Sequence, residues 1–211
     1  MDNRKKRFYL SLISFFILSL LPSFLLYNKI EKEESIAIKA ELFLFSIIIG
    51  EIIAFVTFYT INREDINIKS INFKPTKNPI PYIFGLVFVL IYSLIQIQIP
   101  LVREYSFTFN TLKLFSIFAA IVAGIIEETI FRGYIINYFK SKGSYSIIIS
   151  SLIFSVFHIT WNVFGMLGTF IIGLIFGYIY FKWNSLLPDI ISHALLDSII
   201  EPGMIISFFL I

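Results

Sequence analysis

Six ionisable residues in the second half of the chain have the types and spacings that acid–base chemistry requires. They are Glu127, Glu128, Arg132, His158, His193 and Asp197. All of them lie in strongly apolar stretches, where an ionised side chain at a helix centre costs about 2.5–3.5 kcal/mol to insert into a bilayer. Because of that cost, such groups normally face a bundle interior, pair with one another and mark a functional site.

The first cluster lies within Gly124–Gly133. Glu128 and Arg132 are four residues apart, so they share a helix face and can form an ion pair, which can serve mainly to fix helix packing. Glu127 lies about 100° around the helix from Glu128. Since one arginine neutralises only one of the two carboxylates, we expect Glu127 to act as a general base.

Both histidines of the chain lie in later apolar runs. His158 ends the segment Phe154–His158, and a lone histidine in such a run is commonly a packing residue. His193 precedes Asp197 by one helical turn, so the carboxylate can orient an imidazole or raise its basicity. A rise of about 1.5 Å per residue brings Glu127 and both histidines to similar depths near the bilayer midplane.

Two kinds of chemistry fit this set, and both activate water. In the first, Glu127 and His158 take a proton from water that attacks a peptide carbonyl, while His193 and Asp197 stabilise the oxyanion. In the second, His158, His193 and a carboxylate bind Zn²⁺ and leave one position open for water. The chain contains no HExxH sequence, so ligand spacing does not decide between them.

The composition indicates what kind of fold must hold these residues. Of the 211 residues, 57% are hydrophobic and 15% charged, and the mean hydropathy is +0.85. A chain of this size cannot hide so much apolar surface from water, so lipid must cover much of it. The net charge of +3 is small and dispersed, which argues against nucleic-acid binding, and the lack of cysteine excludes disulfides and thiolate chemistry.

Apolar stretches long enough to cross a membrane recur along the chain. We predict an all-α polytopic bundle of about seven transmembrane helices plus a short C-terminal tail. The expected spans are 8–27, 40–61, 80–99, 112–139, 144–162, 164–181 and 185–200. The first is expected to be retained, because no small-x-small cleavage site follows it. The regions are then 1–111 with three spans, a catalytic core over 112–200, and a tail over 201–211.

Basic residues in the loops predict a cytoplasmic N-terminus. In that orientation the inner side holds eleven of them, namely Arg4, Lys5, Lys6, Arg7, Arg63, Lys69, Lys74, Lys77, Lys140, Lys142 and Lys182. The outer side holds five, namely Lys29, Lys32, Lys39, Arg103 and Lys113. Glu51, in the second span, is either a partner for Arg132 or a residue facing a water-filled cavity.

Three motifs, in this order on separate helices, resemble those of the CAAX-protease and bacteriocin-processing intramembrane proteases, also called the Abi family. They are Glu127-Glu128-x-x-x-Arg132, Phe154-x-x-x-His158 and His193-x-x-x-Asp197. The stretch Phe170-x-x-Gly173-x-x-x-Gly177 followed by Ser185-Leu-Leu-Pro-Asp-Ile-Ile-Ser-His193 is similar to the same family. The glycine spacing also suits close helix packing. The resemblance covers about 112–200.

The resemblance implies a role for each matching residue. Glu127 corresponds to the catalytic glutamate, His158 to its partner in water activation, and His193 to the second active-site histidine. Glu128 and Arg132 correspond to the supporting pair.

Asp197 departs from the family pattern, which commonly has asparagine there. An ionised carboxylate cannot donate to an oxyanion as an amide does, and it favours metal ligation unless it is protonated. The family is generally catalogued as metal-dependent, although a metal-free glutamate mechanism has been argued for some members. Zinc held by His158 and His193 is thus one expectation, and a metal-free site is the other.

We therefore expect an intramembrane metalloendopeptidase or metal-free endopeptidase that hydrolyses a membrane-associated protein or peptide. The abundance of Ile, Lys, Asn and Phe suggests AT-rich coding and hence a bacterial protein. The expected location is then the bacterial cell membrane. One alternative is a non-proteolytic scaffold or bacteriocin-immunity protein of the same family. A small transporter with a proton relay is another, but it would favour repeat-related halves, whereas the buried charge here is concentrated in the last four spans.

Overall fold

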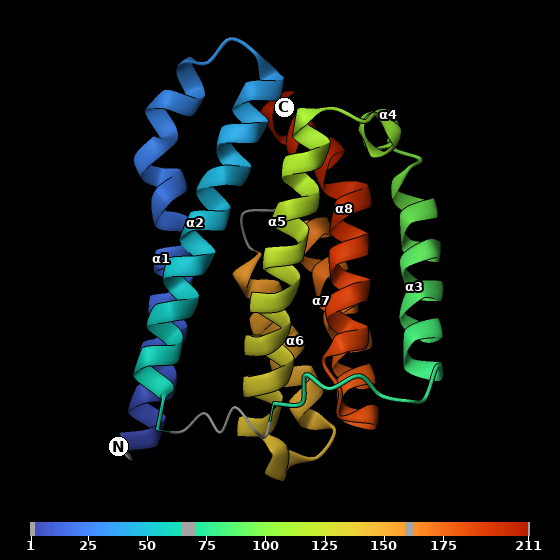
Figure 1. Cartoon of the computed structure of the whole chain (residues 1–211). Coiled ribbons are helices and arrows are strands. Elements are labelled where there is room, and N and C mark those ends of the chain that lie inside the picture. Colours follow the sequence, from blue (N-terminus) through green and yellow to red (C-terminus); the bar gives the residue numbers. More distant parts are fainter. Residues whose placement is uncertain (1–2, 65–70, 159–162, 211) are drawn as a thin grey trace. The chain divides into compact units, whose positions relative to one another are not determined.

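The structure is a computed structural model that describes residues 3–64, 71–158 and 163–210, except the side chain of Phe208 (Figure 1). In this part of the chain every regular element is a helix. The elements are α1 (Asn3–Lys32), α2 (Ile36–Asn62), α3 (Ile80–Gln96), α4 (Pro100–Phe107), α5 (Thr111–Glu127), η2 (Glu128–Ile136), η3 (Lys140–Lys142), α6 (Tyr145–Phe157), α7 (Val163–Trp183) and α8 (Leu187–Leu210). The predicted all-α class is confirmed. Lys69 and the end of the expected fifth span, 159–162, lie outside the described residues.

Within the described residues, five helical stretches are long and apolar enough to cross a bilayer. They are α1, α2, the continuous stretch Thr111–Ile136, α7, and Leu187–Ser207 of α8. The spans expected at 80–99 and 144–162 form the shorter apolar helices α3 and α6. At about 1.5 Å per residue, the 13 residues of α6 fall short of the roughly 30 Å hydrocarbon core. Each of the seven apolar segments thus contains a helix in its described part, and five of these helices have full spanning length.

The C-terminal segment differs from the expected tail. α8 runs from Leu187 to Leu210 and contains Pro202, so residues 201–210 extend the last span as helix. A proline inside a helix removes one backbone hydrogen bond and crowds the preceding turn, but it does not require the helix to end.

The described chain folds into two compact units, neither of which is continuous in sequence. The first unit contains residues 3–64, 89–123 and 193–210, and the second contains residues 71–88 and 124–192. The second unit holds η2, α6 and α7. The boundaries expected at 111/112 and 200/201 remain predictions.

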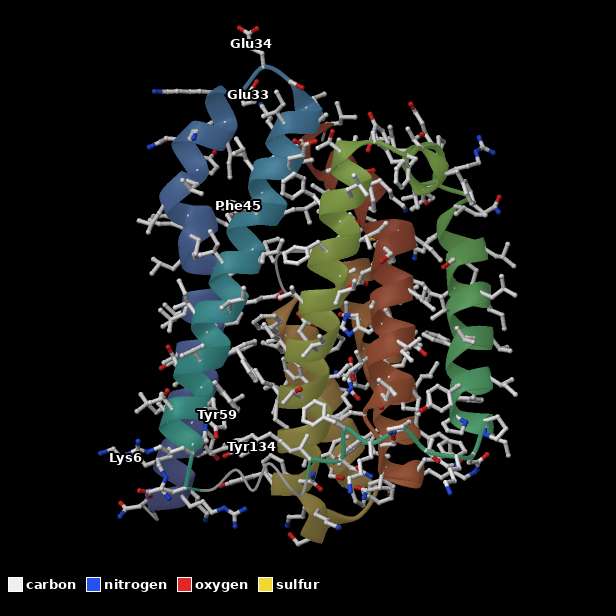
Figure 2. All side chains as sticks on the ribbon, in the orientation of Figure 1. Lys6, Glu33, Glu34, Phe45, Tyr59 and Tyr134 are labelled. Atoms are coloured by element: carbon white, nitrogen blue, oxygen red, sulfur yellow. The ribbon has the colours of Figure 1, made fainter. Side chains whose placement is uncertain are left out.

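In the first unit, α1 and α2 form an antiparallel helical hairpin (Figure 1). Their backbones come into contact at Gly50, where there is no room for a side chain. A Cβ at this position would lie 2.1 Å from the carbonyl oxygen of Ser19. Figure 2 shows Lys6 at one end of the hairpin, and Glu33 and Glu34 at the other. Lys6 and the pair Glu33 and Glu34 thus mark opposite ends of the two spans, while the orientation in a membrane remains a prediction.

In the second unit, α6 and α7 pack closely through the two glycines singled out in the sequence. A Cβ at Gly173 would lie 2.9 Å from the Cβ of Ser151, and one at Gly177 would lie 2.8 Å from Ile147 Cγ2. The expected close packing at this small-xxx-small pair is confirmed.

Candidate active site

The helix that carries the two glutamates changes its hydrogen-bonding pattern between them. α5 ends at Glu127, and Glu128–Ile136 forms a π-helix, all nine residues of which are buried. π-helical turns are rare and occur frequently at functional sites. The 100° separation expected between Glu127 and Glu128 assumes a continuous α-helix, so it does not apply across this junction.

Side chains of the second unit hold this π-helix. Ser150 of α6 donates its hydroxyl to the carbonyl of Phe131 at 2.6 Å. Asn137 donates its amide to the carbonyl of Gly133 at 2.7 Å and to the Tyr180 hydroxyl of α7 at 2.8 Å. Buried carbonyls need such partners. Packing against α6 and α7 therefore stabilises the π-helix, which the apolar periodicity of the sequence does not predict.

Glu128 and Arg132 form the expected ion pair. Arg132 Nε lies 3.0 Å from Glu128 Oε2, and both side chains are buried. The guanidinium carbon lies 4.4 Å from the ring centroid of Phe154 and 5.8 Å from that of Phe176. These aromatic faces stabilise the cation where water has no access. Removing one member of such a buried pair typically costs about 3–5 kcal/mol, because the remaining charge is left uncompensated.

His158 lies at the end of a helix, whereas the expected span 144–162 placed it inside one. α6 ends at Phe157, and the His158 N–H donates to the carbonyl of Ser155 at 3.1 Å, which tightens the last turn. The carbonyl of Phe154 is bonded instead by Nδ1 of the His158 ring at 2.8 Å. Because a carbonyl can only accept, Nδ1 carries the proton and Nε2 carries the lone pair of the neutral ring.

The basic nitrogen of His158 faces Glu127. Nε2 lies 4.0 Å from Glu127 Oε1, with the Glu127 side chain 4% exposed and the His158 side chain 18% exposed. This separation is too long for a direct hydrogen bond. A water bonded to both atoms at about 2.7–2.8 Å would subtend an angle of about 93° at its oxygen, close to the angle between its two hydrogens. The gap therefore suits one water that donates to both acceptors.

Phe154 connects the ion pair with the histidine. Its ring lies 4.5 Å from the His158 ring and 5.0 Å from that of Phe131, between centroids, in addition to its contact with Arg132. A phenylalanine in an apolar run is expected to pack in the core, and the structure adds the cation contact. The i, i+4 spacing to His158 was the signal that could have identified this role.

His193 and Asp197 form a direct pair on α8, in the first unit. His193 Nε2 lies 3.0 Å from Asp197 Oδ2, with the histidine side chain 5% exposed and the carboxylate 26% exposed. An ionised carboxylate accepts, so Nε2 carries a proton here and Nδ1 carries the lone pair when the ring is neutral. Asp197 also interacts electrostatically with Tyr92 of α3. A carboxylate bonded to Nε2 can balance the charge of a doubly protonated imidazole.

The structure brings three pairs of the predicted residues together. They are Glu127 with His158, Glu128 with Arg132, and His193 with Asp197. The first two pairs belong to the second unit and the third to the first unit. Assembly of all three pairs into one site remains a prediction. So do zinc ligation by both histidines and any pairing of Glu51, which is buried in the first unit.

The donor set of the second unit does not suit a zinc ion. Among the described residues, no three His, Asp or Glu side chains group closely enough to hold a metal. A catalytic zinc takes three protein ligands, and tetrahedral geometry brings two of its donors to within about 3.3 Å of each other. Glu127 and His158 supply two donors at 4.0 Å.

A family model described as type II CAAX prenyl endopeptidase Rce1-like matches residues 109–199. The match includes all three motifs and nearly coincides with the region 112–200, so the resemblance seen in the sequence is confirmed there. Comparison with curated proteins and with solved structures gave no match.

Proposed function

We propose that this chain, whose residues 109–199 match the type II CAAX prenyl endopeptidase family, is an intramembrane endopeptidase acting on a membrane-associated protein or peptide. The protease family and the apolar helices support this proposal. The observation that carries it is that Nε2 of His158 lies 4.0 Å from Oε1 of Glu127, while Nδ1 of the same ring bonds the backbone carbonyl of Phe154. This arrangement suits the activation of water.

In the proposed reaction, Glu127 removes a proton from water held between it and His158. The water oxygen forms a bond to the peptide carbonyl carbon, and the carbonyl oxygen becomes an oxyanion. Cleavage of the C–N bond follows, and Glu127 returns the proton to the leaving nitrogen. His158 Nε2 accepts a hydrogen bond from the second hydrogen of the water. This bond orients the lone pair of the water oxygen toward the carbonyl carbon. General base catalysis of this kind contributes about 10²–10⁴-fold.

We assign stabilisation of the oxyanion to His193. With Nε2 bonded to Asp197, a doubly protonated ring offers Nδ1–H as the donor, and the carboxylate balances the charge. An asparagine at position 197 could donate an amide hydrogen itself. In this chain the histidine takes the donor role, and zinc is not required for it.

The substrate class follows from the membrane setting and the family match. The family name refers to prenylated CAAX proteins, so a peptide with a prenylated C-terminal cysteine is the first substrate to test. A membrane-associated bacterial leader peptide without a lipid is the second. Both present a peptide bond near the bilayer interface, and a bacterial cell membrane is the proposed location.

The test is cleavage of both peptides by purified protein in lipid vesicles, with products identified by mass. We expect Glu127→Ala and His158→Ala to lower cleavage about 10²–10⁴-fold, while gel filtration and thermal unfolding stay close to wild type. Glu104→Gln, at an exposed carboxylate of α4, is the matched control and should retain full activity. Undiminished cleavage by the Glu127 variant would overturn the assignment.

A non-proteolytic scaffold or immunity protein is the second candidate, and the buried Glu128–Arg132 pair favours it. This alternative predicts that Glu127→Gln preserves the cellular phenotype and that Glu128→Gln abolishes folding. The endopeptidase proposal agrees on Glu128 but requires loss of the phenotype with Glu127→Gln. The Glu127 variant therefore separates the two functions.

A further inference from the structure

Pro202 interrupts the hydrogen bonding of α8 one turn after the His193–Asp197 pair. Proline has no N–H, and its ring crowds the carbonyl four residues earlier. In α8 that carbonyl belongs to Ser198, which directly follows Asp197. The helix therefore lacks its own donor at the turn that carries the carboxylate.

Lys113 supplies a donor in its place. The ammonium of this lysine, in the first turn of α5, donates to the carbonyl oxygen of Ser198. Ser106 of α4 donates its hydroxyl to the next carbonyl, that of Ile199, at 2.7 Å. Two side chains from other helices thus bond the carbonyls of the two residues that follow Asp197 in α8.

Close packing fixes the same turn from the α4 side. A Cβ at Gly203, directly after the proline, would lie 2.3 Å from Val102 Cα of α4. Lys113 also interacts electrostatically with Glu201 of α8. The part of α8 around Pro202 is therefore held by a backbone contact, a buried hydroxyl and a charged donor, all within the first unit.

A different residue at position 202 would bond Ser198 without any ammonium. An ammonium in an apolar stretch is expensive, and an ordinary backbone N–H would satisfy the same carbonyl at no such cost. The combination of proline and lysine instead ties the turn of Asp197 to α5. The position of the carboxylate then depends on a contact outside its own helix.

We propose that Lys113 is a positioning residue for the His193–Asp197 pair. Through Ser198, it fixes the turn of α8 that sets the distance between the carboxylate and the imidazole. The inference rests on the proposed function, in which this pair stabilises the oxyanion. A misplacement of about 1 Å in such a group can cost on the order of 10²-fold in rate.

The experiment is a rescue. Lys113→Met keeps an apolar stem and removes the donor, and we expect kcat to fall about tenfold with KM nearly unchanged. Pro202→Ala restores the helix N–H to Ser198 and should be close to wild type alone. Combining the two should return kcat to within about threefold of wild type. Lys113→Arg keeps a cationic donor and should also retain activity.

Lys39→Met is the matched control. Lys39 lies on α2 in the same unit and is half-buried, and its loss should leave kcat unchanged. Failure of Pro202→Ala to rescue Lys113→Met, with both proteins folded, would overturn the inference.

A second measurement is independent of cleavage. The chain has two histidines, so side-chain ¹⁵N spectra of each can be assigned by substituting the other. Lys113→Met should shift or broaden the His193 signals, Pro202→Ala should restore them in the double variant, and the His158 signals should not move. Unaltered His193 signals in Lys113→Met would refute the positioning role. Absence of Glu127-dependent cleavage with these shifts intact would instead refute the endopeptidase proposal alone.

Discussion

The two histidines of this protein lie in opposite chemical settings. His158 ends α6, donates through Nδ1 to a backbone carbonyl, and faces the carboxylate of Glu127 across 4.0 Å. His193 lies within α8 and contacts the carboxylate of Asp197 at 3.0 Å. The longer distance suits a water between two acceptors, and the shorter one is a direct bond. Residues of the same type thus differ in role because different atoms of each ring are committed.

The largest expected effect tests whether Glu127 and His158 act on one water. Glu127→Gln and His158→Ala should each lower kcat about 10²–10⁴-fold. Because both residues bind the same water, kcat/KM of the double variant should be no more than a few-fold below that of the less active single variant. The measurement is the full double-variant cycle in kcat/KM. Losses that multiply would mean that the two residues act separately.

A smaller effect is expected at the second histidine. His193→Ala should lower kcat about 10²–10³-fold, as loss of an oxyanion donor does. Asp197→Asn should lower kcat by a similar factor, because the amide oxygen can still accept from Nε2 but no longer balances the charge of a doubly protonated ring. Steady-state kcat and KM of the two variants provide the check. A much smaller loss in Asp197→Asn than in His193→Ala would contradict the assignment of a doubly protonated ring as the donor.

Phe154→Leu should alter the surroundings of His158 without altering those of His193, and its main effect should be on stability. The substitution removes the aromatic face above Arg132 and beside His158, so the free energy of unfolding should fall by about 1–3 kcal/mol. The kcat should fall only a few-fold, and the His193 ¹⁵N signals should stay in place. Phe24→Leu, at a 78% exposed position of α1, is the control. Denaturant unfolding in mild detergent gives the comparison.

The smallest expected effect is that of metal removal. Since Glu127 and His158 do not fit a zinc site, a strong chelator should leave the cleavage activity unchanged. The metal content of purified preparations, measured by elemental analysis, should not correlate with their activity. Loss of cleavage that returns on adding zinc would contradict the proposed mechanism. It would support ligation by both histidines instead.

The sequence predicted the local features of the site well. The ion pair of Glu128 with Arg132 and the contact of His193 with Asp197 follow from four-residue spacing along one helix. The close packing at Gly173 and Gly177 follows from the size of the residues. Each of these predictions depends on atoms that one helix, or one small surface, brings together.

Helix ends and helix type could not be predicted in the same way. In the π-helix over Glu128–Ile136, the carbonyl of Phe131 accepts from Ser150 of α6, and the cap residue Asn137 donates to Tyr180 of α7. The end of α6 at Phe157 depends on the bond from the His158 ring to a carbonyl of its own helix. Periodicity averages over a whole stretch, so it gives no signal for such individual hydrogen bonds.

The amino-acid sequence by itself determined the membrane class, the helical segments and the six ionisable residues, because hydropathy and fixed spacing are properties of the linear chain. Only the tertiary structure decided which ring nitrogen of each histidine carries a proton and how far each lies from a carboxylate. It also decided that Lys113 bonds the turn opposite Pro202. The physical reason is that hydrogen-bond partners from separate helices are selected by packing, which no local pattern encodes.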